Sequence, residues 1–338
     1  MATLARRDDA ELARGVQAWC GREVAEMARP NAGWTNETLL VRVVDGRRFV
    51  VRLPPPLPTW PAYDLATEAG VLRALADSDV LVPRVLAFET DEQWFGAPFL
   101  VLSHEAGRPI GEVPALDPWL VDATHDDQRA VHTAFVRVLA SLHRFDWRAA
   151  SLDATLRGAG TPLSAEIAYW RDYIEWAGDG APARVLRDAV AWCAQTVPAR
   201  EPAPSLCWGD PRLGNVMYHD DRTVAAVLDW EMASIGPAET DLAWYLALDD
   251  LTFHFTQRRV HGFLTRAEVI AAYERSLGRA VVDLAWHEIF ALVRSSAVND
   301  RQARLAAQTG MAYPGVAGDD NPVLAYLSAQ IDAFTDRG

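Results

Sequence analysis

Three polar side chains between Cys207 and Trp230 have the types and the spacing that phosphoryl transfer needs. Asp210 precedes Asn215 by five positions, and Asp229 follows Asn215 by fourteen. A carboxylate at the first position can orient and deprotonate an attacking hydroxyl group. An amide and a second carboxylate can hold Mg²⁺ against the phosphates of a nucleotide. The alternative for Asp210 is a turn or helix-cap aspartate before Pro211.

The local pattern predicts how these side chains are presented. Residues 224–228 form a short apolar run, preceded by the polar, turn-like residues 219–222, so a strand is expected there. Asp210 and Asn215 then lie on a loop, and Asp229 lies at the end of the strand that returns beside it. Two neighbouring charges are open to two interpretations each. Arg212 can stabilise the transferring phosphoryl group or pair with nearby acids, and Glu231 can be a second metal or water ligand or a solvated acid.

The loop resembles that of the aminoglycoside phosphotransferase family, which is related to the protein kinases and phosphorylates small molecules. The family loop reads His-Gly-Asp-x-x-x-x-Asn and is followed by a metal-binding Asp. The matching positions here are Trp208, Gly209, Asp210, Asn215 and Asp229. The resemblance extends from about residue 31 to about residue 305. It is greatest for a branch that includes kinase-like domains fused to acyl-CoA dehydrogenases.

Two further positions follow from this resemblance. Asp241, in Asp-Leu-Ala, corresponds to the start of a core helix whose Asp holds the catalytic loop in place. Trp208 departs from the pattern, because the family has His there. The His of kinases is structural, and we expect Trp208 to fill its volume without its hydrogen bond. We interpret the change as subfamily variation, because the proton-accepting and metal-binding positions remain filled.

A basic residue and an acid are expected to meet near the nucleotide phosphates. Residues 39–44 and 47–53 read as a hairpin around Asp45-Gly46, and Arg52 lies on its second strand. Glu68 falls on the apolar stripe of a helix predicted at about 62–77, where a carboxylate usually has a cation as partner. The kinase resemblance implies that Arg52 contacts phosphate and Glu68 positions it. The alternatives are an exposed strand arginine and a glutamate at the helix edge.

The remaining nucleotide contacts are implied by the resemblance alone. Residues 31–38 occupy the place of the glycine-rich loop, although an ordinary turn before a strand explains them equally well. Residues 103–106 occupy the place of the hinge, whose backbone would meet the adenine edge. The residues that we assign to nucleotide binding in these two segments are Gly33, Thr35, Asn36, Thr38, Ser103 and Glu105.

The order of predicted elements favours an α+β, protein-kinase-like fold with two lobes. We expect a nucleotide-binding lobe at 1–105, with an amphipathic helix at 9–27, the hairpin, the helix at 62–77, and strands at 80–88 and 99–103. A helical lobe at 106–338 would carry the catalytic loop and the acceptor site. Its helices are predicted at about 127–145, 164–176, 182–196, 239–248, 266–277 and 283–307, with a long loop at 308–323.

Composition excludes several classes of partner. The chain of 338 residues has a formal net charge of −14, which disfavours nucleic acid because such binding needs clustered Lys and Arg. An anionic nucleotide must then be bound by a local positive patch and Mg²⁺. No apolar run approaches the roughly 18–20 residues that span a bilayer. Three scattered cysteines and the lack of an N-terminal signal region make the cytoplasm the expected location.

These observations lead to a main hypothesis and two alternatives. The main hypothesis is a phosphotransferase that uses ATP and Mg²⁺, with GTP not excluded, to phosphorylate a hydroxyl group of a small molecule. The first alternative is a pseudokinase that binds a nucleotide or metabolite without transfer, in line with Trp208 and Arg52. The second concerns the acceptor, a hydroxyacyl compound or its CoA thioester instead of an aminoglycoside. The acceptor, the nucleotide and the oligomeric state stay open.

Overall fold

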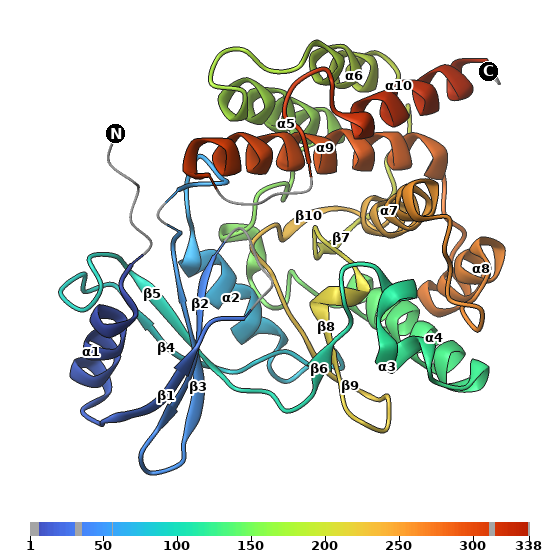
Figure 1. Ribbon diagram of the computed structural model, residues 1–338. Coiled ribbons are helices and arrows are strands. Elements are labelled where there is room, and N and C mark those ends of the chain that lie inside the picture. Colours follow the sequence, from blue (N-terminus) through green and yellow to red (C-terminus); the bar gives the residue numbers. More distant parts are fainter. Residues whose placement is uncertain (1–6, 31–35, 56, 311–314, 337–338) are drawn as a thin grey trace.

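The computed structural model describes residues 7–30, 36–55, 57–310 and 315–336, which form a sheet-bearing part and a helical part (Figure 1). The sheet is antiparallel, with the strand order β1-β2-β3-β5-β4. Its strands are β1 (Val24–Ala28), β2 (Glu37–Val43), β3 (Arg48–Leu53), β4 (Val85–Glu89) and β5 (Phe99–Ser103). The predicted α+β class is confirmed.

The hairpin of β2 and β3 forms as predicted and sets the position of Arg52. The two strands pair from Glu37 opposite Leu53 to Arg42 opposite Arg48. Gly46 closes the turn with a φ of +86°, a conformation that glycine adopts at little cost. Because side chains alternate along a strand, this register directs Arg52 to the face of the sheet that carries α2 (Leu65–Leu75), where Glu68 lies.

Two predicted boundaries in this part are wrong. The helix expected at 9–27 is α1 (Asp9–Cys20), which ends because Gly21 adopts a left-handed conformation, and β1 follows it. The strand expected at 80–88 begins only at Val85. Pro83 interrupts the apolar run, since proline has no N–H to donate to a sheet.

The helical part holds the long helices and two small sheets. The sheets are β6 (Arg108–Pro109), β8 (Val216–Tyr218) and β9 (Val224–Val227), and β7 (Pro204–Cys207) paired with β10 (Ser234–Pro237). The α-helices are α3 (Pro118–Val121), α4 (His125–His143), α5 (Leu163–Ala177), α6 (Arg184–Gln195), α7 (Glu239–Thr256), α8 (Arg266–Leu277), α9 (Leu284–Thr309) and α10 (Pro322–Thr335). Short 3₁₀ turns occupy Pro114–Leu116, Leu152–Ala154 and Leu213–Asn215.

The six helices predicted here are present, although α7 continues well beyond the expected 248. The helix α10 was not predicted. The loop expected at 308–323 overlaps both neighbouring helices, because α9 continues to Thr309 and α10, capped by Asn321, begins at Pro322. Residues 311–314 of that loop lie outside the described residues.

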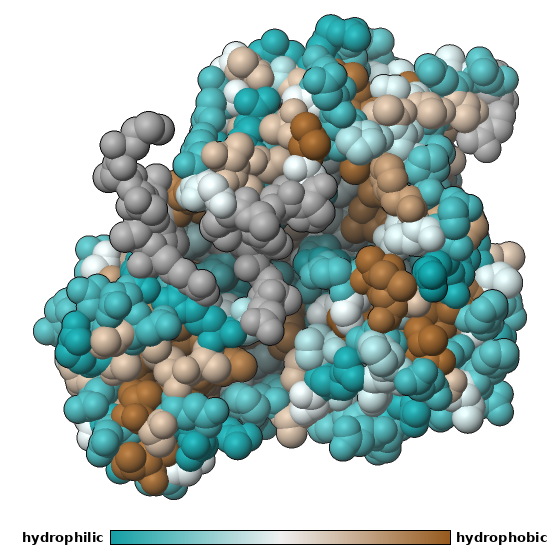
Figure 2. All heavy atoms as spheres, in the orientation of Figure 1, coloured by the Kyte–Doolittle hydropathy of each residue, from teal (hydrophilic) through white to brown (hydrophobic). Residues whose placement is uncertain are grey.

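A segment between β3 and α2 connects the two parts. Residues 57–64, which we call the strap, extend from the sheet toward α9 (Figure 1). Arg301 Nε donates to Pro58 O at 3.2 Å, and Tyr173 OH donates to Thr59 O at 3.0 Å. Trp60 packs against Tyr173 with ring centroids 5.2 Å apart. The surface is hollowed between the two parts, and this face is largely hydrophilic (Figure 2).

Candidate active site

The loop between β7 and β8 is anchored from below by Asp241 of α7. The carboxylate of Asp241 accepts hydrogen bonds from the backbone N–H of Trp208 at 2.6 Å and of Gly209 at 3.0 Å. Its Oδ2 also lies 3.0 Å from His143 Nε2, and His143 Nδ1 lies 2.5 Å from Tyr273 OH. The predicted anchoring of the loop by Asp241 is therefore present in the structure.

His143, Cys207 and Asp241 also approach one another closely enough to be considered as a metal site. Their potential ligand atoms lie within 4.8 Å of one another and are buried. However, both carboxylate oxygens of Asp241 already accept backbone hydrogen bonds. We therefore interpret the cluster as part of the support of the loop.

The side chain of Asp210 is held by three donors. Its Oδ1 accepts from Trp244 Nε1 at 2.8 Å, and its Oδ2 accepts from Asn215 Nδ2 and Arg212 Nε, each at 2.9 Å. Arg212 also pairs with Glu112. The Asp210 carboxylate, despite the opposing effect of burial, raises the pKa of Arg212 above its ordinary value, and Glu112 adds to this effect. Of the two interpretations of Arg212, pairing with neighbouring acids is the one that the geometry displays.

Asp229 arrives beside this loop as expected from the strand. β9 ends at Val227, and the N–H of Leu228 donates to Asn215 O at 2.8 Å, which ties the two loops together. Asp229 itself adopts a left-handed conformation with a φ of +63°. Its Oδ1 accepts from Arg52 NH2 at 3.3 Å. The chain thus brings Asp229 next to the basic residue of β3.

Trp208 does more than fill the volume of the family histidine. It is completely buried, and its Nε1 donates to Leu228 O and Asp229 O, each at 2.9 Å. The expectation that Trp208 lacks a hydrogen bond is therefore wrong. An indole carries a polar N–H at the edge of a large apolar ring, so it can fill the space and still support the loop that bears Asp229.

The predicted contact between Arg52 and Glu68 is present and buried. Arg52 NH1 lies 2.6 Å from Glu68 Oε1, and the residues are 9% and 2% exposed. Burial by itself would lower the pKa of Arg52, but Glu68, Asp229 and Glu231 together raise it. Arg52 therefore remains a cation, and both alternatives, the exposed strand arginine and the helix-edge glutamate, are wrong.

Glu231 is enclosed by donors from the sheet-bearing part and the strap. Its Oε2 accepts from Asn36 Nδ2 at 2.7 Å and from Tyr63 OH at 3.3 Å, and its Oε1 accepts from Trp60 Nε1 at 3.0 Å. Burial and the charge of Glu231 raise the pKa of Tyr63. The solvated-acid interpretation of Glu231 is wrong, since its side chain is only 11% exposed.

The other nucleotide-binding candidates are distributed around this centre. Gly33 and Thr35 lie outside the described residues, whereas Asn36 contacts Glu231. Thr38 pairs with Arg52 across the β2–β3 ladder. At the end of β5, Ser103 Oγ accepts from the N–H of Arg84 at 2.7 Å and donates to Glu105.

Sequence reasoning missed Trp60, Tyr63 and Trp244 as residues of this site. Each carries one polar atom on a large apolar ring, and each uses that atom on Asp210 or Glu231. Buried tryptophan and tyrosine usually find a polar partner, so their residue types were the available signal. The identity of the partner was not available from spacing.

Comparison with known proteins decides the family. The model of the phosphotransferase enzyme family matches residues 26–279. The chain belongs to this family. Its region of similarity includes Arg52, Glu68, the loop with Asp210 and the anchor Asp241. The prediction of a phosphotransferase is confirmed by this membership.

Related chains and structures agree with this assignment. Acyl-CoA dehydrogenase family member 10 of Mus musculus is 28% identical over 222 residues, which cover 65% of this chain and 20% of that protein. The chain thus spans about a fifth of the length of that relative. A candidate aminoglycoside phosphotransferase from Ralstonia eutropha has a similar structure, with a TM-score of 0.66, 22% identity, and coverage of 88% of this chain and 90% of that one.

A second similar structure contains bound ligands. It is a thermostable mutant of the aminoglycoside phosphotransferase APH(4)-Ia in a ternary complex with AMP-PNP and hygromycin B. Its TM-score is 0.57 at 14% identity, and the match covers 95% of this chain and 96% of that one. Likeness at this level of identity concerns the fold, and it confirms the predicted kinase-like, two-lobed architecture. Among the described residues, no helix is long and apolar enough to cross a membrane.

Proposed function

We propose that this phosphotransferase transfers the γ-phosphoryl group of ATP to a hydroxyl group of a small molecule at the site around Asp210. The observation that carries the proposal is the convergence of Asp210, Asn215 and Asp229 beside the buried Arg52–Glu68 pair. We further propose that residues 1–105 bind the nucleotide and that residues 106–338 bind the acceptor. Nucleotides present in similar structures include GDP and AMP-PNP, so GTP remains an alternative donor.

The proposed step needs one base and several fixed charges. Asp210 accepts the proton of the acceptor hydroxyl while a bond forms between that oxygen and the γ-phosphorus. The bond from the γ-phosphorus to the bridging oxygen breaks, and ADP leaves. Arg52, positioned by Glu68, binds phosphate, and Arg212 is close enough to Asp210 to contribute to charge stabilisation. Most of the acceleration comes from positioning and charge neutralisation, because the transition state is loose.

The polar atoms of the site fit a magnesium ion. Asn215 uses its amide nitrogen to donate to Asp210, which directs its amide oxygen away from that carboxylate. This oxygen and the carboxylate of Asp229 are ligands of the kind that Mg²⁺ prefers. Bound there, Mg²⁺ would neutralise phosphate charge. We propose Asn215 and Asp229 as its ligands, and Glu231 as a ligand only where it gives up its present donors.

The class of acceptor is a separate proposal. The relative from Mus musculus is named as an acyl-CoA dehydrogenase, which favours a hydroxyacyl compound or its CoA thioester. The similar structure with hygromycin B favours an aminoglycoside. Arginines after residue 250 do not decide between them, because they are largely engaged locally: Arg259 and Arg266 with Asp250, Arg301 with Asp179, and Arg304 with Asp300.

Calorimetric titration of ATP and GTP, with and without Mg²⁺, tests the nucleotide half of the proposal. We expect binding that requires Mg²⁺ and weakens at least about tenfold in Asp229→Asn, because a charged ligand of the metal is lost. Asp220→Asn is the matched control, since it removes the same charge from an exposed turn. Binding that is indifferent to metal and to Asp229 would favour the pseudokinase alternative.

Release of ADP in the presence of candidate acceptors tests the transfer step. We expect Asp210→Asn to abolish turnover while the nucleotide affinity stays within about twofold, because Asp210 acts on the acceptor and not on the nucleotide. The acceptors to compare are hydroxyacyl-CoA compounds and aminoglycosides. Turnover that survives in Asp210→Asn within about tenfold would show that Asp210 is not the base.

A further inference from the structure

One face of α7 contacts three consecutive residues of the loop that carries Asp210. Asp241 accepts the backbone N–H groups of Trp208 and Gly209. Trp244, three positions later on the same face of the helix, donates from Nε1 to Asp210 Oδ1 at 2.8 Å. The first contact fixes the backbone of the loop, and the second fixes the side chain of its carboxylate. Trp244 itself is only 4% exposed, so its ring has little freedom to move.

A buried arginine of α9 lies against the other side of this indole. Arg294 is 1% exposed, and its guanidinium carbon lies 4.8 Å from the centre of the Trp244 ring, 5.3 Å from Phe290 and 5.8 Å from Trp170. We call these three rings the aromatic box. Attraction between a cation and an aromatic face reaches about 2 kcal/mol when both are desolvated. The box therefore compensates part of the cost of burying this charge.

Arg294 has few polar partners of its own. Among the described residues, its hydrogen bond is a long one of 3.4 Å from NH2 to Thr240 O, and its Nε has no partner. Glu166 and Asp241 influence Arg294 only from a distance, since Glu166 contacts Trp170 and Arg157 while Asp241 holds the loop. Burial lowers the pKa of Arg294, and these two acids oppose the effect.

The burial of the Arg294 charge requires an explanation, because a well-packed apolar side chain of similar volume is often at least as stabilising as a buried ion. The contact with Trp244 provides this explanation. A cation over the face of an indole withdraws electron density from the ring, which makes the N–H a stronger donor to the carboxylate at its edge. It also holds the ring plane, and with it the direction of the N–H.

We propose that Trp244 is a positioning residue for Asp210, and that Arg294 in the aromatic box fixes the Trp244 indole and strengthens its hydrogen bond to Asp210. This inference rests on the proposed role of Asp210 as the base. Neither residue touches a reacting atom. Their effect is to keep the Asp210 carboxylate in one orientation relative to the acceptor hydroxyl, together with the donors Asn215 and Arg212 on its other oxygen.

The indole N–H resonance of Trp244 in ¹⁵N-labelled protein tests the inference without any need for turnover. The resonance is assigned by its loss in Trp244→Phe. We expect it to move in Asp210→Asn, where the acceptor loses its charge, and in Arg294→Met, where the cation is replaced by an apolar side chain of similar length. Trp147 is the internal reference, because its Nε1 donates to Pro204 O at 3.2 Å and its ring is not one of the three in the aromatic box. A Trp244 resonance that stays in place in Arg294→Met, in a protein that melts as wild type does, would overturn the role of Arg294.

Turnover gives the second readout, with ADP release measured at saturating nucleotide. Trp244→Phe keeps the ring but removes the donor, and hydrogen bonds to a charged group are worth enough for a loss of kcat of about 10- to 100-fold. The KM for the nucleotide should stay within about twofold. Arg294→Met should lower kcat in the same direction, but less.

Trp147→Phe is the matched control for turnover. It removes a buried indole N–H that donates to a backbone carbonyl, that of Pro204, and leaves the aromatic box intact. A purely structural role for Trp244 predicts that Trp244→Phe and Trp147→Phe lose kcat equally, and that result would overturn the inference. If nucleotide binding itself proves independent of Mg²⁺ and of Asp229, the proposed function fails. The Trp244 resonance still reports separately on the Arg294–Trp244–Asp210 contact.

Discussion

Arg52 and Glu68 form a single buried ion pair at this site. Their charged groups lie 2.6 Å apart with almost no exposure, and Arg52 also reaches Asp229. Removing one partner of a buried ion pair leaves the other charge buried without compensation. At the surface, the same pair of residue types is worth little, because water and salt screen it.

The first prediction is therefore a comparison of two arginine–glutamate pairs whose arginines lie on neighbouring strands of the same sheet. We expect Glu68→Gln to lower the free energy of unfolding by about 3–5 kcal/mol and to weaken Mg²⁺-dependent nucleotide binding. Glu26→Gln disturbs the exposed pair of Glu26 with Arg42, 2.9 Å apart, and should cost less than about 1 kcal/mol. Urea unfolding measures both, and equal losses would contradict the buried role of Glu68.

At the scale of elements, the two loops of the site approach each other so closely that only glycine fits between them. Gly209 has a φ of +95°, and a Cβ there would lie 2.4 Å from Met232 O. The loop of Asp210 is thus packed directly on the segment that follows Asp229. The strap adds a second connection, because Trp60 and Tyr63 bind Glu231 in that same segment. These contacts make the geometry of the site depend on several elements at once.

The second prediction isolates this close approach with two glycine-to-alanine changes. Gly46→Ala, in the β2–β3 turn, places an alanine at a similarly positive φ, but its Cβ enters open space. We therefore expect it to lower the free energy of unfolding by about 1–2 kcal/mol. Gly209→Ala adds an overpacking cost of about 1–3 kcal/mol and should also weaken Mg²⁺-dependent nucleotide binding. Thermal melts and calorimetry measure the two effects. Similar behaviour of the two variants would mean that the loops separate easily.

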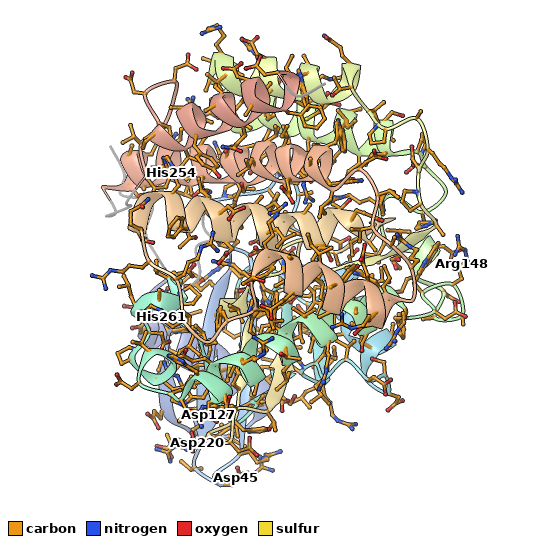
Figure 3. All side chains as sticks on the ribbon, turned by 90° about the vertical axis from the view of Figure 1, so that its right-hand side faces the viewer. Asp45, Asp127, Arg148, Asp220, His254 and His261 are labelled. Atoms are coloured by element: carbon orange, nitrogen blue, oxygen red, sulfur yellow. The ribbon has the colours of Figure 1, made fainter. Side chains whose placement is uncertain are left out.

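At the scale of the whole molecule, charge is distributed unevenly between surface and interior. Asp45, Asp127 and Asp220 lie at one end of the molecule, where Asp45 and Asp220 are exposed, and His254 and His261 lie toward another side (Figure 3). Two other histidines are buried without charge. Burial lowers the pKa of His132 to about 3 and that of His287 to about 4. These two groups make the stability of the fold depend on pH.

The third prediction follows from the sign of those shifts. Because the unfolded chain binds protons near pH 6.5 and the folded chain does not, stability is full above that pH and is lost as the pH falls toward the folded values. Each histidine should lower the free energy of unfolding by about 2 kcal/mol at pH 5 relative to pH 8. Urea midpoints between pH 5 and pH 8 measure the slope. His132→Asn, whose amide oxygen can accept from the N–H of Leu264 as Nδ1 does now, should flatten it.

His261→Asn provides the comparison for that slope, because His261 is exposed. It should leave the dependence of the urea midpoint on pH as in the wild type. If His132→Asn also left the slope unchanged, the loss of stability at low pH would arise from groups other than this buried histidine.

Local order along the chain was enough to predict that the residues to which we assign the chemistry lie close together. Asp210, Asn215 and Asp229 meet because a loop, a short hairpin and a strand end bring neighbours in sequence together. Arg52 and Glu68 could be paired because alternation on a strand and the stripe of a helix each assign a face. The predicted boundaries of α1 and β4 were wrong because a single residue, Gly21 or Pro83, interrupts the apolar pattern.

Only the tertiary structure decided how these residues are held. Trp244 on Asp210, Arg294 in the aromatic box and the strap on Glu231 join segments that lie far apart in the sequence. Such contacts leave no periodic signal, because a tryptophan looks the same in a pattern whether its N–H faces a backbone carbonyl or a catalytic carboxylate. The sequence by itself determined the candidate residues of the site and most of the elements that carry them. The packing of α7, α9 and the strap determined their orientation, since orientation depends on contacts that exist only once the chain has folded.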